Sequence, residues 1–96
     1  MPTTPNLVEV AEILKRHLPE GYQAVLFGSR ATGKARLRSD WDIGLLGPKP
    51  LRGAIVQRIR FDLEDMRTLH SFEVVDLMKT TEFFRKAALR KVVRLV

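Results

Sequence analysis

The sequence contains no cysteine among its 96 residues. This absence excludes a disulfide framework and a zinc site built on thiolates, so any metal must be held by oxygen or imidazole ligands. Aromatic residues are also scarce, at 7%, and the one Trp and one Tyr lie far apart in the chain. A stacking platform for single-stranded nucleic acid is therefore not indicated, and hard cations are the expected metals.

Long apolar runs are missing as well, and no basic-then-apolar leader opens the chain. Because a membrane span needs about 18 uncharged apolar residues, we expect a soluble, cytoplasmic protein that has no membrane segment. With 45% hydrophobic residues, a chain of 96 is long enough for one modest core and too short for two. Residues 1–96 are therefore expected to form a single domain.

Positive charge exceeds negative charge, with 17 Lys and Arg against 11 Asp and Glu, for a net charge of +6. Such a balance attracts nucleotides, nucleic acid or an acidic protein without choosing among them, so direct nucleic-acid binding stays open. Lys34, Arg36 and Arg38 precede Asp40, where they would steer an anionic substrate or simply remain solvated.

Apolar periodicity predicts alternating helices and strands. Helices are expected at residues 6–18 and 51–68 and after Thr80 or Thr81, and strands at 22–27, 40–46 and 72–78, with a β-prone tail at 92–96. Trp41 is expected in the core, and His17 and His70 at helix ends on the surface. Because Phe83 and Phe84 are adjacent, only one of them can face the core.

Two aspartates, Asp40 and Asp42, stand two apart on a predicted strand and therefore project from the same face. Two carboxylates at this distance repel one another unless a cation lies between or beside them, although both could also be solvated. The turn at Gly28 and Ser29 follows a hydrophobic strand, where backbone N–H groups and a hydroxyl form a cradle for anions. Together the two features suit Mg²⁺ and a nucleoside triphosphate.

The same turn also begins like a Walker A loop, because Gly28 is followed by four residues and then by Gly33 and Lys34. That loop requires Ser or Thr next, to hold Mg²⁺, and a helix that continues from the lysine. Ala35 occupies the position, and the segment runs instead into a strand. A P-loop is thus rejected.

Gly28-Ser29, ten intervening residues and Asp40-Trp41-Asp42 resemble the signature of the DNA polymerase β-like nucleotidyltransferases. The short length and the Gly-Ser-Arg-Ala-x-Gly form are similar to the minimal nucleotidyltransferases, the partners of HEPN-domain proteins in toxin–antitoxin pairs. The resemblance implies an α+β fold, a small mixed β-sheet with helices packed on one face, as in a polymerase β-like palm.

The resemblance further implies that Asp40 and Asp42 bind two divalent ions, Mg²⁺ or alternatively Mn²⁺. Ser29, with the adjacent backbone of Gly28, would hold the β,γ-phosphates. Arg30 would donate both arms of its guanidinium to the triphosphate, or would instead cap a helix or pair with an acid.

A third carboxylate would come from the next strand, where Glu73 and Asp76 are candidates. Strand parity puts the two on opposite faces, so at most one can join the site. We expect Glu73, because Phe72 and Val74 are apolar and would face the helices, with Asp76 as the alternative.

Two functions from different classes follow. The first is an antitoxin that acts as a Mg²⁺-dependent enzyme. It would transfer AMP from ATP onto an acceptor hydroxyl, and this hydroxyl would belong to a tyrosine of a HEPN toxin. The second is a non-catalytic antitoxin that masks a partner protein. In either case the resemblance implies a HEPN-domain partner, and a homo- or hetero-oligomer is compatible with it.

Overall fold

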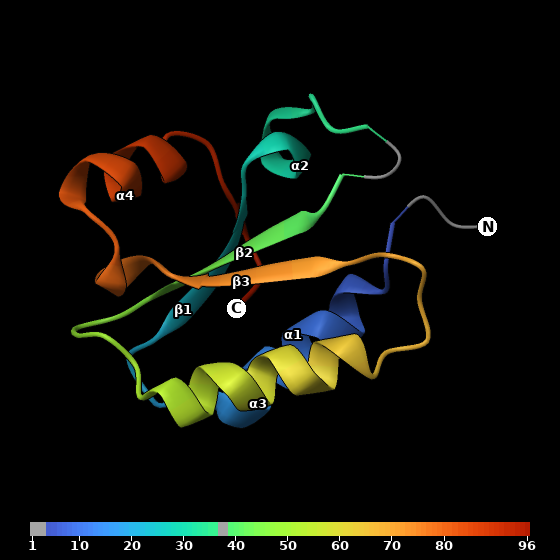
Figure 1. The fold of residues 1–96 in the computed structure, drawn as a ribbon, viewed down its shortest axis with the longest axis horizontal. Coiled ribbons are helices and arrows are strands. Elements are labelled where there is room, and N and C mark those ends of the chain that lie inside the picture. The colour runs from blue at the N-terminus through green and yellow to red at the C-terminus, as the bar shows by residue number, and fades with distance from the viewer. Residues whose placement is uncertain (1–3, 37–38) are drawn as a thin grey trace.

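The computed structural model describes residues 4–36 and 39–96, so Arg38 lies outside the described residues. Four strands form one sheet: β1 (Gln23–Phe27), β2 (Trp41–Leu46), β3 (Phe72–Asp76) and β4 (Val93–Arg94). Their order is β3-β2-β1-β4, with β1 antiparallel to β2 and β4, and β2 parallel to β3 (Figure 1). The expected α+β fold with a mixed sheet is confirmed.

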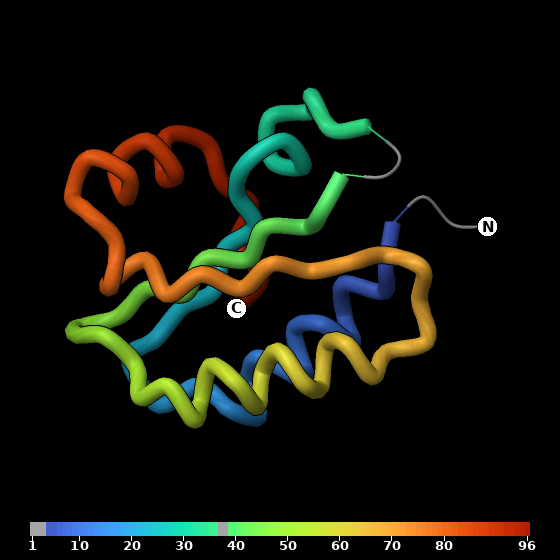
Figure 2. Tube along the Cα trace, in the orientation of Figure 1, coloured from blue at the N-terminus to red at the C-terminus, as the bar shows by residue number. Residues whose placement is uncertain are grey.

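Helices lie on both sides of this sheet, whereas the resemblance implied helices on one face only (Figure 1). The two long helices, α1 (Leu7–His17) and α3 (Gly53–Glu64), run together along one face, as Figures 1 and 2 show. The short helices α2 (Ser29–Thr32) and α4 (Glu82–Ala88) lie on the other side, and the 3₁₀ turn η1 (Leu77–Lys79) follows β3 (Figure 1). The first face carries the core, and the second carries the predicted site.

The core fills the space between the sheet and the two long helices. Every second residue of a strand points to the same face, and the residues that face α1 and α3 are apolar. The core residues contributed by these helices and strands are Val10, Ile13, Leu14, Ala24, Ile43, Leu45, Val56, Ile59, Leu63 and Val74. Trp41 is also buried, as expected.

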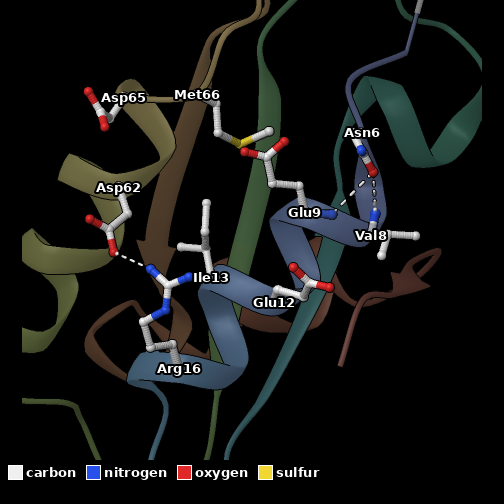
Figure 3. Close-up of a pocket in the computed structure, with 9 residues that line it drawn as sticks. All are labelled: Asn6, Val8, Glu9, Glu12, Ile13, Arg16, Asp62, Asp65 and Met66. Atoms are coloured by element: carbon white, nitrogen blue, oxygen red, sulfur yellow. Dashed lines mark hydrogen bonds and ion pairs between the residues drawn. The ribbon is translucent and has the colours of Figure 1, made fainter.

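Local signals explain where the helices begin and end. The Asn6 side chain accepts hydrogen bonds from the Val8 and Glu9 backbone N–H groups, so α1 begins where a capping residue was expected (Figure 3). Thr81, rather than Thr80, caps α4 by accepting from the Phe84 N–H. Helix α3 ends at Glu64, four residues before the predicted end, and Met66 remains buried in the turn that follows.

The two long helices are joined at one end by a charged contact. Asp62 Oδ2 of α3 lies 2.6 Å from Nε2 of His17 and 3.4 Å from Nη1 of Arg16, both on α1 (Figure 3 shows the Arg16 contact). The hydrogen bond from His17 lowers the pKa of the Asp62 carboxyl from its ordinary value, with further help from the charges of His17 and Arg16. His17 is therefore a helix-end residue, as expected, that ties α1 to α3.

Replacing Asp62 with Asn should lower stability in a pH-dependent way. A lowered pKa in the folded state means that the ionised carboxylate stabilises the fold above its unfolded pKa, and that this contribution is lost as the pH falls through the lower, folded value. Urea unfolding at pH 7 should show Asp62→Asn less stable than the unaltered chain, and the difference should shrink below the ordinary pKa of 3.8. Asp65→Asn, an exposed carboxylate in the same groove (Figure 3), is the control. A difference that stays constant with pH would contradict the assignment.

No helix within residues 4–36 and 39–96 is long and apolar enough to cross a membrane.

Candidate active site

The pairing of β2 with its two neighbours brings the central predicted residues together. Asp42 is the register partner of Phe27 on antiparallel β1 and of Glu73 on parallel β3. Partners in register point to the same side of a sheet, so Asp42 and Glu73 share the face opposite α1 and α3. This juxtaposition depends on the parallel β2–β3 ladder, which the crossover through α3 makes possible.

Gly28 closes the site on the β1 side. Its backbone has φ 71° and ψ −151°, a combination that is essentially restricted to glycine. A Cβ atom at this position would overlap Oδ2 of Asp42, so the missing side chain is what lets the Gly28–Ser29 turn approach the carboxylate. Ser29 begins α2 directly afterwards, half-buried beside the same turn.

Asp40 lies just before β2, and its carboxylate accepts a hydrogen bond from Ser71, the residue just before the neighbouring strand β3. The Ser71 hydroxyl donates a hydrogen bond of 2.6 Å to Oδ1 of Asp40, and the Trp41 N–H bonds to the Ser71 carbonyl. Ser71 was not predicted as a site residue. The register of Trp41 with Phe72 places residues 40 and 71 side by side, so the parallel pairing is the signal that could have found it.

Asp40, Asp42 and Glu73 form a cluster of carboxylates that repel one another. Burial raises the pKa of the Asp42 carboxyl, and the neighbouring charges of Glu73 and Asp40 and a hydrogen bond with Glu73 raise it further. Across residues 4–36 and 39–96, no ion pair joins Asp40, Asp42 or Glu73 to a basic side chain. The cluster therefore carries negative charge that the described protein groups leave uncompensated, which is the condition that favours a bound cation.

The donor set fits a divalent ion that shares its ligands with water and phosphate. No three His, Asp or Glu side chains of the described residues converge into a ready metal cage. Mg²⁺, however, is bound in phosphate-handling sites through only one or two carboxylates, with waters and substrate phosphates completing its shell. Asp42 and Glu73, adjacent on one face, meet that requirement.

Arg30 contacts the segment around Asp40. Its Nη2 donates a 2.7 Å hydrogen bond to the Ser39 carbonyl, and its guanidinium carbon lies 4.3 Å from the centre of the Trp41 ring. These contacts hold the backbone that leads into Asp40, a role for Arg30 that the sequence did not predict. A stacked guanidinium is well suited to this because its flat face packs while its edge donates.

Asp76 lies on the opposite face from Glu73 and is buried. Its two carboxylate oxygens accept hydrogen bonds from the backbone N–H groups of Leu51, at 2.8 Å, and Met78, at 3.0 Å. It therefore anchors the segment before α3 and caps η1, away from Asp42.

The change Asp76→Ala should accordingly act on stability. The buried Leu51 N–H and the part-buried Met78 N–H would lose their partner, which costs about 2 kcal/mol or more of unfolding free energy. Chemical denaturation measures this loss, with exposed Asp65→Ala as the control. Unaltered stability of the Asp76→Ala chain would contradict this structural role.

The chain matches the family described as "Polymerase beta, Nucleotidyltransferase" over residues 9–96. Comparison with curated proteins found no match. Among solved structures, a chain of a toxin–antitoxin complex with AMP-PNP is 21% identical to this chain, with a TM-score of 0.78. The match covers 96% of this chain and 73% of the length of the other chain. A chain from a complex of tri-AMPylated Shewanella oneidensis HEPN toxin with MNT antitoxin is 18% identical with a TM-score of 0.63, covering 94% and 68%.

These structural likenesses show a shared fold, and the family match extends over most of the sequence, from α1 to β4. The Gly-Ser turn and the aspartate pair, which carried the resemblance in the sequence, lie within the matched residues. This chain belongs to the polymerase beta nucleotidyltransferase family.

Proposed function

We propose that residues 1–96 act as one minimal nucleotidyltransferase domain that moves AMP from ATP onto an acceptor hydroxyl. The observation that carries this proposal is the Asp42–Glu73 pair, uncompensated by described basic groups and bordered by a glycine whose missing side chain admits the Gly28–Ser29 turn. The family to which the chain belongs supports the same reaction class.

Each residue has a distinct part in this reaction. Asp40, Asp42 and Glu73 would supply oxygen ligands for two divalent ions, Mg²⁺ or Mn²⁺. When bound, such ions offset the charge of the phosphates and favour ionisation of the attacking hydroxyl. Gly28 and Ser29 would hold the β,γ-phosphates through backbone N–H groups and the hydroxyl. Arg30 would act indirectly, by fixing the segment before Asp40.

The bonds that change are those at the α-phosphorus. The acceptor oxygen forms a bond to this atom, the bond to the bridging oxygen breaks, and pyrophosphate leaves. Glu73 is the more exposed of the two paired carboxylates, and it would accept the proton of the hydroxyl.

The acceptor in this proposal is a tyrosine of a HEPN-domain toxin, and the chain is its antitoxin in the cytoplasm. Support comes from the two similar structures, one a toxin–antitoxin complex with AMP-PNP and one with an AMPylated HEPN toxin. AMP on a tyrosine would add charge and bulk at the toxin's surface, which is a direct way to block it.

The position of a radiolabel in ATP tests the reaction. The chain is incubated with Mg²⁺ and a HEPN-domain toxin, once with ATP labelled at the α-phosphate and once with ATP labelled at the γ-phosphate. Label from the α-position should enter the HEPN protein and label from the γ-position should not, and chelation by EDTA should stop the transfer. Incorporation of γ-label would show phosphoryl transfer and refute the proposal.

A second candidate function is a non-catalytic antitoxin that masks its partner. It is favoured by the observation that the described acids form no three-residue metal cage as they stand. Toxin neutralisation in cells separates the two functions. If a chain carrying both Asp40→Asn and Asp42→Asn still neutralises the HEPN toxin, masking is the function, whereas loss of neutralisation by a folded double variant supports transfer.

A further inference from the structure

Four polar residues form two facing pairs across the neighbouring strands β2 and β3, which lie side by side in Figure 1. In the parallel register Asp42 lies beside Glu73. Just before both strands, Asp40 lies beside Ser71. The two aspartates of the predicted metal site therefore have different neighbours, a second carboxylate for Asp42 and a hydroxyl for Asp40.

The backbone around Asp40 is held on both sides. On one side, Nη2 of Arg30 donates a hydrogen bond of 2.7 Å to the Ser39 carbonyl. On the other side, the Trp41 N–H donates a hydrogen bond of 2.9 Å to the Ser71 carbonyl. Asp40 itself lies outside β2 and is exposed, so the freedom that remains to it is rotation of its side chain.

The Ser71 hydroxyl restricts this rotation. Its hydrogen bond to Oδ1 of Asp40 is 2.6 Å long, the length typical of a hydroxyl that donates to an ionised oxygen, which is stronger than a bond between neutral groups. Because the Ser71 backbone is tied to Trp41, the hydroxyl reaches Asp40 from a fixed point. Within residues 4–36 and 39–96, no group donates to the other oxygen, Oδ2.

Asp42 is held in place differently, by packing. It lies within β2 and is half-buried. Its Oδ2 stands so close to Gly28 that a Cβ atom there would overlap it. The hydrogen bond from Ser71 thus does for the exposed Asp40 what the strand and the Gly28 backbone do for Asp42.

We propose that Ser71 is a positioning residue for metal binding. Its hydroxyl holds Oδ1 of Asp40 and leaves Oδ2 as the oxygen that would bind a divalent ion. The inference rests on the proposed function, because it names the group that prepares one of the ligands. Outer-shell hydrogen bonds of this kind fix the orientation of a ligand, and their loss lowers metal affinity about 10–100-fold.

Removing and restoring the hydroxyl tests this role. Ser71→Ala deletes the donor, and Ser71→Thr keeps a hydroxyl at the same position. Thr80→Ala is the matched control, because it deletes a hydroxyl hydrogen bond of 2.7 Å, to the Leu77 carbonyl, at the end of η1. Electron paramagnetic resonance of Mn²⁺ with AMP-PNP should show binding about tenfold or more weaker in Ser71→Ala, within about threefold of the unaltered chain in Ser71→Thr, and unchanged in Thr80→Ala.

Carboxyl ¹³C NMR gives a second measurement that needs neither metal nor turnover. In the metal-free chain, Ser71→Ala should shift the side-chain carboxyl signal of Asp40, because that carboxylate loses its hydrogen bond. The signal of Asp76, which bonds to other groups, should stay in place and serves as the internal reference.

The outcomes separate this inference from the reaction itself. Equal Mn²⁺ affinity for the unaltered and Ser71→Ala chains, an affinity that Ser71→Thr does not recover, or an Asp40 signal that Ser71→Ala leaves in place would each overturn the role of Ser71 while α-label transfer could stand. Tighter Mn²⁺ binding by Ser71→Ala would overturn it too, because the hydroxyl would then compete with the ion for Asp40. If the unaltered chain binds no Mn²⁺ with AMP-PNP, the proposed function falls, and this inference with it.

Discussion

Replacing Asp42 with Asn should abolish nucleotide transfer and at the same time stabilise the nucleotide-free chain. Transfer should fall about a thousandfold or more, because Asp42, in our proposal the central oxygen ligand of the divalent ions, loses the charge that would hold them beside the phosphates. Stability should rise because the Asp42 carboxylate is partly buried beside Glu73 and Asp40, and the neutral amide removes that repulsion.

The stability gain has a defined pH dependence. The pKa of Asp42 is raised in the folded chain, so at a pH below its ordinary value of 3.8 the residue is neutral and costs nothing. As the pH rises from this ordinary value toward the raised folded value, ionisation of Asp42 increasingly destabilises the fold, and the advantage of Asp42→Asn grows until it is complete above the folded pKa. Thermal unfolding at pH 3 and pH 7 measures it, beside initial rates of α-label transfer. Asp65→Asn should change neither quantity, and an Asp42→Asn chain that is less stable at pH 7 or still active would contradict this account.

Gly28→Ala adds a single methyl group to the site, and we expect it to lower both stability and nucleotide transfer strongly. The backbone region of Gly28 costs an alanine about 1–3 kcal/mol, and the new methyl must also displace the Asp42 carboxylate. We expect a loss of about 3 kcal/mol or more in unfolding free energy and no detectable transfer in the fraction that folds.

Gly33→Ala is the matched control for this prediction. Gly33 also has a positive φ, 77°, but a Cβ there meets nothing within 4 Å. It should therefore show only backbone strain, about 1–2 kcal/mol, and keep its transfer activity. Urea unfolding and transfer rates compare the two variants. Shortening the obstructed side chain, in the double variant Gly28→Ala with Asp42→Ala, should recover part of the stability. Equal losses for Gly28→Ala and Gly33→Ala would show that the contact with Asp42 is unimportant.

Much of this arrangement could be predicted, because it depends on the spacing of apolar residues in helices and on the alternation of side chains between the two faces of a strand. The strand around Asp42 alternates strictly, so the faces of Trp41, Ile43 and Leu45 followed directly from sequence. The same parity separates Glu73 from Asp76, and the structure places the two on opposite faces. Helix α1 was delimited by a capping side chain at Asn6, a local signal that needs no tertiary contact.

What could not be predicted depends on contacts between distant segments. The direction of Arg30 is decided by Trp41 and Ser39, which lie beyond a loop with no periodic pattern. Helix α2 has four residues, too few for a periodic signal, and was expected only as a turn. The predicted end of α3 was too late because Met66 continues the apolar spacing although it packs from a turn.

We propose that Asp42 and Glu73 together hold the divalent ion that accompanies the nucleotide. Electron paramagnetic resonance of Mn²⁺, titrated with the chain in the presence of AMP-PNP, measures this binding without any turnover. Asp42→Asn and Glu73→Gln should each weaken Mn²⁺ binding about tenfold or more, as expected when a ligand or its close partner is removed, while Asp65→Asn binds like the unaltered chain. Mn²⁺ affinity that is the same in all four chains would contradict the claim.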